Sequence, residues 1–299
     1  PMLLGHESTV TSLVLSSDGS RLYSGSVDKT IREWSLSSGQ CIRRLEGHSS
    51  GVTSLVLASD GSLYSGSEDG TICKWSLSNG ECVHQFRGHS SMVTTLVMSK
   101  SHLFSGSVDK TIREWSLSTG DCFRVLEGHS SGVTSLVLSS DGSRLYSGSW
   151  DKTIWEWSLL SGECVRPLTG HHGAVSCLVL SFDDSLLYSG SWDKTIYEWS
   201  LSSGDCRRLK GHSSGVTSVA LCADSSGSHR LFSGSHGATI REWSLPSGDY
   251  LRRLEGHSSM VTTLLSDGSR LYSGSDDKTI REWSLSSGEC VRRLEGHPG

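Results

Sequence analysis

A unit of about 40 residues recurs along the whole chain, and this repeat limits the possible folds more than any other feature. A Gly-His pair opens each unit, and successive pairs lie 40 to 45 residues apart. A tryptophan recurs in phase with these pairs, at Trp34, Trp75, Trp115, Trp157, Trp199, Trp243 and Trp283. The 299 residues therefore hold seven complete units and the Gly-His pair that would open an eighth. Because the repeat fills the chain, we expect one closed domain rather than the two that length alone suggests.

Each unit has the pattern of four short strands. In the first unit, segments 10–16, 21–26, 30–36 and 41–45 are mostly rich in β-branched or large apolar side chains, with turn residues between them. Segments of this length and composition are typical of antiparallel strands joined by tight turns. Ile31 and Trp34 are three residues apart and point to opposite faces of a strand, so each sheet is apolar on both faces. A ring of sheets covers both faces of every sheet.

The sequence therefore predicts an all-β fold, a seven-bladed β-propeller with four antiparallel strands per blade, as a single domain over residues 1–299. The predicted blades are residues 5–46, 47–87, 88–127, 128–169, 170–210, 211–255 and 256–297. The last unit carries its own fourth strand, so we expect blade seven to pack on blade one without a shared strand. That joint is then the place most prone to opening.

Three motifs recur along the chain: the Gly-His before the first strand of a unit, a Ser-Gly-Ser-x-Asp leading out of the second strand, and the tryptophan of the third strand. Together they resemble the WD-repeat β-propeller family over essentially all of the chain. Serine follows that tryptophan in every unit, where the family's namesake pair has aspartate. The near-identical units differ in loop length, for example by an insertion at 222–232, which favours a recently amplified array over a designed one.

Composition and charge argue against several classes of partner. The formal net charge of -5 lacks the basic excess of a general nucleic-acid binder, so we expect no nucleic-acid partner. No apolar run reaches the ~20 residues of a membrane helix, so we expect no membrane partner. The few residues before the first Gly-His are too short for a signal peptide, so we expect an unexported chain.

The cysteines indicate a reducing compartment. Equivalent positions of different blades lie far apart, whereas a disulfide needs Cα atoms within about 7 Å, so we expect free thiols and a cytoplasmic protein. The sequence has no CxxC pair that could bind zinc, and the His171-His172 pair has no further ligand spaced nearby. We therefore expect no metal and no cofactor. Six of the nine cysteines share one position of successive units: Cys41, Cys82, Cys122, Cys164, Cys206 and Cys290.

Units also share a histidine, a serine, an aspartate and a tryptophan, as in His6, Ser24, Asp28 and Trp34. Serine, histidine and aspartate are the residues of a hydrolase triad. An enzyme needs one such set, however, and this chain has near-copies in successive units without a G-x-S-x-G motif to present the serine. We therefore favour a structural role and predict no enzymatic activity.

The family resemblance implies how these four residues, here called the relay, interact. The aspartate holds the histidine, the histidine holds the serine, and the serine accepts a hydrogen bond from the indole N–H; either serine of Ser-Gly-Ser could take part. The relay extends to His48, Ser65, Asp69 and Trp75; His89, Ser105, Asp109 and Trp115; His129, Ser147, Asp151 and Trp157; His171, Ser189, Asp193 and Trp199; and His257, Ser273, Asp277 and Trp283. In unit six Gly237 replaces the aspartate, so His212, Ser233 and Trp243 are left with a broken relay and blade six should be weak.

Three positions differ between units while most of their surroundings repeat. The rim position, directly before the relay aspartate, holds Val27, Glu68, Val108, Trp150, Trp192, His236 and Asp276. The wall position, two residues before the relay tryptophan, holds Arg32, Cys73, Arg113, Trp155, Tyr197, Arg241 and Arg281. The loop position, three residues after the relay histidine, holds Thr9, Gly51, Met92, Gly132, Ala174, Gly215 and Met260. All three lie near one end of the strands, here called the top face.

Positions that serve only packing should hold similar residues in every blade, so the variable positions predict a recognition surface. Aromatic side chains are frequent anchors of interfaces, and four of them fall on adjacent blades four and five, with a histidine in the loop between. We predict a monomeric scaffold that binds a protein or peptide on its top face. The predicted contact residues are Trp150, Trp155, Trp192, Tyr197, His172, His236, Glu68 and Asp276.

Two alternatives stay open at this point. A small molecule or glycan could bind at the central mouth or between blades, where the aromatic rings would stack on a sugar. Trp155 and Tyr197 could instead pack in the seam between blades, and the same structural role is open for Trp150 and Trp192.

Overall fold

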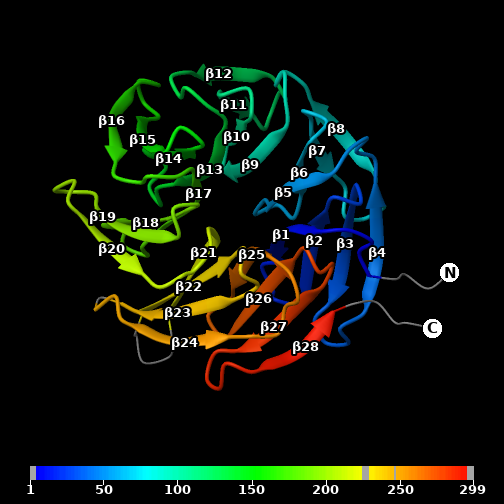
Figure 1. The fold of residues 1–299 in the computed structure, drawn as a ribbon. Coiled ribbons are helices and arrows are strands. Elements are labelled where there is room, and N and C mark those ends of the chain that lie inside the picture. Colours follow the sequence, from blue (N-terminus) through cyan, green and yellow to red (C-terminus); the bar gives the residue numbers. More distant parts are fainter. Residues whose placement is uncertain (1–4, 224–228, 246, 295–299) are drawn as a thin grey trace.

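The computed structural model describes residues 5–223, 229–245 and 247–294, which form seven four-stranded sheets arranged as blades around a common axis (Figure 1). The predicted fold class, a seven-bladed β-propeller with antiparallel blades, is confirmed. Across the described residues there is no helix, and hence none long and apolar enough to cross a membrane.

The first four blades have closely similar strand lengths. Blade one contains β1 (Val10–Leu15), β2 (Arg21–Ser26), β3 (Thr30–Ser35) and β4 (Cys41–Glu46). Blade two contains β5 (Val52–Leu57), β6 (Leu63–Ser67), β7 (Ile72–Trp75) and β8 (Cys82–Phe86). Blade three contains β9 (Val93–Met98), β10 (His102–Ser107), β11 (Ile112–Ser116) and β12 (Cys122–Leu126). Blade four contains β13 (Val133–Leu138), β14 (Arg144–Ser149), β15 (Thr153–Ser158) and β16 (Cys164–Thr169).

The last three blades repeat this plan, with longer first and second strands in blade six. Blade five contains β17 (Val175–Leu180), β18 (Leu186–Ser191), β19 (Thr195–Ser200) and β20 (Cys206–Lys210). Blade six contains β21 (Val216–Ala223), β22 (His229–Ser235), β23 (Ile240–Ser244) and β24 (Tyr250–Leu254). Blade seven contains β25 (Val261–Ser266), β26 (Arg270–Ser275), β27 (Ile280–Ser284) and β28 (Cys290–Leu294).

Every sheet pairs its strands in chain order, and the first strand of each blade lies nearest the axis (Figure 1). No sheet of the described part borrows a strand from another blade. The ring nevertheless closes, because Val10 and Trp34 of blade one share a buried apolar cluster with Tyr272 and Leu294 of blade seven. Closure therefore depends on side-chain packing and on hydrogen bonds between the two blades.

A glycine–valine contact brings each blade close to the next. Gly148, between the two serines of β14, packs on Val175 at the start of β17, and a Cβ added at Gly148 would lie 2.7 Å from Val175 Cγ1. Carbon atoms essentially never approach so closely, so any side chain larger than hydrogen at this position would force the two blades to shift apart. The same pair recurs as Gly25–Val52, Gly66–Val93, Gly106–Val133, Gly190–Val216, Gly234–Val261 and, across the closing joint, Gly274–Val10.

A ring of side-chain hydroxyls adds a hydrogen bond at each joint. Thr134 Oγ1 of β13 donates to the carbonyl oxygen of Val175 on the next blade, at 2.6 Å. Equivalent bonds run from Thr11, Thr53, Thr94, Ser176, Thr217 and Thr262 to Val52, Val93, Val133, Val216, Val261 and Val10, respectively. The last of these bonds closes the ring.

We expect Thr134→Val to lower the free energy of unfolding by about 1 kcal/mol, because it leaves the carbonyl of Val175 without this donor. The measurement is urea unfolding followed by circular dichroism. Thr169→Val, at the exposed end of β16, is the control for the change in side-chain chemistry. If both variants lose the same stability, the hydroxyl ring does not stabilise the joints.

Candidate binding face

The relay residues of blade four show the arrangement found in six of the seven blades. His129 Nδ1 donates to Asp151 Oδ2 at 2.7 Å, and Ser147 Oγ donates to His129 Nε2 at 2.7 Å. The indole N–H of Trp157 donates to the same Ser147 oxygen at 2.8 Å. The first serine of Ser-Gly-Ser therefore makes the bond. The other complete sets are those of blades one, two, three, five and seven.

The aspartate of each complete relay also fixes two loops of the top face. Asp151 accepts hydrogen bonds from the backbone N–H groups of Ser130, in the loop before β13, and of Thr153, after the turn between β14 and β15. The hydroxyl of Ser147 is fully buried and is engaged by both His129 and Trp157. A nucleophile has to reach its substrate, so this geometry suits a support for loops better than acyl transfer.

Burial and hydrogen bonding set the ionisation of the relay. Burial raises the pKa of Asp69, but hydrogen bonds from Thr71 and the attraction of His48 more than offset it, and the net result is a pKa of about 2. Burial lowers the pKa of His48 below its usual value, against the opposing effect of Asp69. The relay of blade two is therefore a carboxylate facing a neutral imidazole at pH 7.

Blade six has the shortened relay that its sequence predicts. His212 Nε2 lies 2.6 Å from Ser233 Oγ, and the indole of Trp243 donates to Ser233 at 2.8 Å, but Gly237 offers His212 no carboxylate. Burial, and secondly the charge of Arg241, lower the pKa of His212 to about 4. A Cβ at Gly237 would meet its nearest atoms, Ser214 Oγ and Ser235 Oγ, at an ordinary 3.5 Å. The site therefore has room for a Cβ.

Two tryptophans at rim positions are exposed on the top face. Trp150 and Trp192 have 38% and 55% of their surface exposed, respectively. The ring of Trp192 lies 6.0 Å from that of His236, edge to face, and His236 is itself exposed on blade six. Atoms of both residues lie about Gly215, because a Cβ added there would be 3.2 Å from His236 Cδ2 and from Trp192 Cα. Gly215 therefore packs closely against both residues, and a side chain at this loop position would crowd them.

The carboxylates of two acidic residues at rim positions accept hydrogen bonds from other residues of the protein. Glu68 Oε2 accepts hydrogen bonds from Ser50 Oγ at 2.9 Å and from the backbone of Gly51 at 3.2 Å. Asp276 accepts from Ser259 Oγ at 3.0 Å and from Thr9 of blade one, so it helps to join blades seven and one. Both carboxylates already have hydrogen-bond partners of their own.

His172 is exposed in the loop before β17, and its backbone N–H donates to Asp193 Oδ2 at 2.9 Å. Its side chain is available to solvent. No group of three or more His, Cys, Asp or Glu side chains suited to a metal ion occurs in the described part of the chain. All nine cysteines are free thiols, as the sequence predicts.

The wall-position aromatics lie deeper than the rim tryptophans. The ring centre of Trp155 is 4.9 Å from that of His129, and the ring centre of Tyr197 is 4.5 Å from that of His171. Both side chains are half-buried and pack against apolar clusters in the seams between blades, Trp155 between blades three and four and Tyr197 between blades four and five. Trp155 also lies over Gly128, where an added Cβ would be 2.2 Å from the ring. The structure therefore separates these two aromatics, which support the relay, from the exposed pair.

The sequence interpretation missed a second surface at the opposite ends of the strands, lined by Lys74 and Lys100. Two signals in the sequence point to it. Unit two has lysine directly before the relay tryptophan, where the other six units have glutamate, and unit three, like unit seven, has a first turn of only three residues.

A closed ring of seven four-stranded blades with a recurring relay defines a β-propeller built from sequence repeats. The chain belongs to the WD40 family, described as WD domain, G-beta repeat, whose model matches residues 2–35, 39–76, 80–116, 120–158, 162–200, 204–244 and 248–284. Each matched segment after the first begins before the outermost strand of one blade and ends with the third strand of the next. The family resemblance predicted from the sequence is confirmed.

Two relatives are similar to a short stretch of the chain. WD repeat-containing protein 18 of Homo sapiens is 56% identical over 39 residues, which are 13% of this chain and 9% of that protein. Its counterpart in Bos taurus is 54% identical over 39 residues, with the same shares. The match spans about one repeat, so it covers far less than the length of these relatives. WD-repeat propellers generally act as scaffolds for protein interactions and are typically non-enzymatic.

We expect Gly237→Asp to raise the free energy of unfolding by about 1–2 kcal/mol, because it supplies the carboxylate that His212 lacks in blade six. Urea unfolding at about pH 7 measures the effect. Gly237→Asn is the matched control, since it adds a side chain of the same size without the charge. A Gly237→Asp protein no more stable than the wild type would contradict the stabilising role of the relay.

The same variant should be less sensitive to acid. The pKa of His212 is about 4 in the folded protein, against 6.5 for a free histidine. The unfolded chain therefore binds more protons between these values, and the folded state loses stability as the pH falls through that window. A carboxylate beside His212 raises its folded pKa, so the loss from about pH 7 to about pH 5 should be smaller in Gly237→Asp than in the wild type or in Gly237→Asn.

Proposed function

We propose that this protein is a non-enzymatic scaffold that binds a protein or peptide segment through its top face. The contact patch consists of Trp150, Trp192 and His236 on blades four to six. The observation that carries the proposal is the exposure of two tryptophans at equivalent positions of adjacent blades. The other blades place smaller or internally bonded side chains at this position.

The chemistry of the patch supports a polypeptide partner. A tryptophan carries a large apolar surface together with an N–H donor, which suits a contact that loses water on binding. The loop position beneath this part of the rim holds Gly132, Ala174 or Gly215, and the ring of Trp150 lies against Gly132, where an added Cβ would be 3.0 Å from it. By the equivalence of the blades, Ala174 lies between Trp150 and Trp192 as Gly215 lies between Trp192 and His236.

The remaining predicted residues take secondary parts in this proposal. Trp155 and Tyr197 form the wall behind the patch and hold the relay histidines in place. His172 is an exposed neighbour of the patch. Glu68 and Asp276 maintain loop structure on blades two and seven, because their carboxylates are already bonded. The free thiols support a reducing compartment, and we place the scaffold in the cytoplasm as a monomer.

The test is a double variant, Trp150→Ala with Trp192→Ala, compared with the wild type in pull-downs from lysate analysed by mass spectrometry. We expect at least a tenfold loss of the captured partner, or about 1.4 kcal/mol in binding free energy, with little change in the melting temperature. Phe182→Ala is the matched control, because Phe182 is an exposed aromatic of blade five in the turn before β18 at the other end of the strands.

Two outcomes would contradict the proposal. If the double variant captures the same proteins as the wild type, the patch is not the binding site. If it unfolds, the two rings are structural. A thermal-shift screen with saccharides tests the other class of ligand, since a glycan receptor would be stabilised by a sugar and would lose that response in the double variant.

A further inference from the structure

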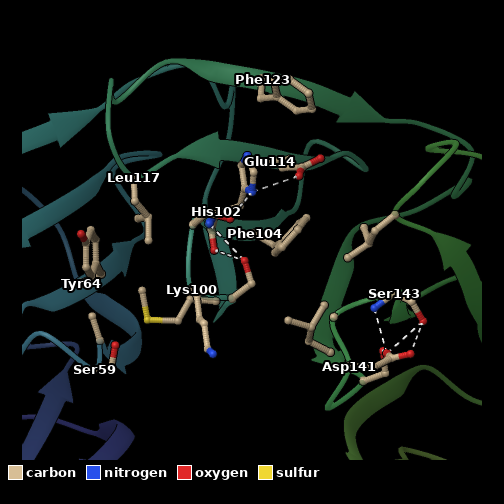
Figure 2. A pocket seen from close by; sticks show the side chains of 18 of the residues that line it. Ser59, Tyr64, Lys100, His102, Phe104, Glu114, Leu117, Phe123, Asp141 and Ser143 are labelled. Atoms are coloured by element: carbon tan, nitrogen blue, oxygen red, sulfur yellow. Dashed lines mark hydrogen bonds and ion pairs between the residues drawn. The ribbon is translucent and has the colours of Figure 1, made fainter.

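A cavity of about 1180 Å³ opens at the other end of the strands, beneath blades two, three and four (Figure 2). Its rim consists of the first turns of these blades, at residues 58–60, 99–101 and 139–143. Strand connections at this end are opposite those that carry the relay aspartates, so the cavity is separate from the patch on the top face. A volume above the usual 300–1,000 Å³ of a small-molecule pocket suits a segment of polypeptide.

The cavity exists because blade three has a short first turn. Three residues, 99–101, join β9 to β10, whereas five residues join the equivalent strands in blade two, 58–62, and in blade four, 139–143. The longer turns project on either side of the shorter one. The space between them is a groove across blade three.

The floor and one edge of the groove are apolar. Leu57, Met98 and Leu138 come from three successive blades and are partly exposed in its inner part, whereas Tyr64 and Phe104 are buried. At the outer edge Phe123 is 62% exposed and Leu160 is 95% exposed. Figure 2 shows Tyr64 and Phe104 on either side of His102 and Lys100, with Phe123 on the outer strand β12. Exposed apolar groups next to a concave surface mark sites of interaction.

Two lysines give the groove a charge that the other blades lack at these positions. Lys74 of β7 stands where the other six blades have glutamate, and Lys100 stands in a turn that has lost the aspartate of its neighbours. In blade four the glutamate at this position, Glu156, pairs with Arg166 at 2.7 Å. Blade two has His84 opposite Lys74 instead. Within the described residues, neither lysine forms an ion pair with a carboxylate.

The acidic groups that face the groove have partners in their own blades. Glu114 pairs with Arg124 at 3.0 Å and lies 3.8 Å from His102. Asp141 accepts hydrogen bonds from Ser139 Oγ at 2.6 Å and from the backbone N–H of Ser143 at 2.9 Å. Asp60 accepts from the backbone of Ser62 at 2.8 Å, with Lys74 near enough to help lower the pKa of Asp60.

Lys74 is held in the groove by an aromatic contact. Its Nζ lies 5.6 Å from the centre of the Tyr64 ring, a distance at which the ring face attracts a cation. The ammonium is thus placed beside the apolar floor. A ligand that brings both an apolar side chain and carboxylates would find complementary groups within one cavity.

From this combination we propose that the groove binds an acidic, extended segment of a partner protein. A large apolar side chain of the segment packs on Leu57, Met98 and Leu138, and flanking carboxylates approach Lys74 and Lys100. Because the groove and the top face are at opposite ends of the strands, the protein would hold two partners at once. This second site gives the scaffold a means of bringing two proteins together.

The test uses a fluorescein-labelled heptapeptide, Glu-Asp-Phe-Glu-Leu-Asp-Glu, titrated with the protein and followed by fluorescence anisotropy. The comparison peptide carries lysine at every acidic position. We expect the acidic peptide to bind more tightly than the basic one, and to bind more weakly as salt is raised, because the attraction is electrostatic.

The decisive variant is Lys74→Glu with Lys100→Asp, which installs the acidic residue types that other blades carry at this end. We expect at least a tenfold rise in the dissociation constant for the acidic peptide. Lys29→Asp with Lys210→Glu changes the net charge equally at other surfaces and should leave binding unchanged. Lys74→Ala with Lys100→Ala is a second variant, with the same direction of effect, that decides the question if the charge reversal impairs folding.

Several results would overturn the proposal. These are equal binding of the two peptides, unchanged affinity in both lysine variants, and an equal loss in the Lys29/Lys210 control. The Trp150/Trp192 double variant should bind the acidic peptide as well as the wild type does. Failure of the groove is thereby distinguishable from failure of the top-face patch.

Discussion

The contact between a glycine of one blade and a valine of the next is the constraint on which the rest of the structure depends. Each sheet is apolar on both faces, so it is stable only between two others. Gly148 and Val175 meet so closely that a side chain on the glycine would push the blades apart. All seven joints meet the same requirement, and this explains why the core of the unit barely changes along the chain while positions outside the joints differ.

The relay gives the loops of the top face the same arrangement in each blade that has it. By holding two loops with one carboxylate, a residue such as Asp151 fixes the backbone on which the rim side chains stand. A binding surface on a rigid support loses less entropy when a partner arrives. Blade six departs from the rule, and the neighbour of its missing aspartate is His236, part of the proposed patch. We expect stability to be lowest in the blade that borders this surface, a pattern common at functional sites.

The fold and the relay could be predicted from the sequence. The period of the repeat gives the number of blades, and the spacing of His6, Asp28 and Trp34 identifies the relay. The burial of the Trp155 side chain could not be predicted, because it depends on the space over Gly128 in a neighbouring loop. The choice of the first serine depends on which side chain of the strand faces the histidine. The groove was hidden for a similar reason: it arises from turn lengths in three blades, and Lys74 and Lys100 meet only when those blades are placed side by side.

Closure of the ring by side-chain contacts alone is the central claim, and the joint between blades seven and one tests it most directly. An added Cβ at Gly274 would lie 2.7 Å from Val10 Cγ1, as one at Gly25 would from Val52 Cγ1. A Cβ at Gly274 would also lie 2.8 Å from Thr263 Cγ2 of its own blade, and Gly106 has the same pair of contacts, with Val133 Cγ1 at 2.6 Å and Thr95 Cγ2 at 2.8 Å. The free energy of unfolding of Gly274→Ala, measured by urea denaturation beside Gly106→Ala, should therefore fall by about the same 1–3 kcal/mol in both. A clearly smaller loss in Gly274→Ala than in Gly106→Ala would show that the ring is open at this joint in solution.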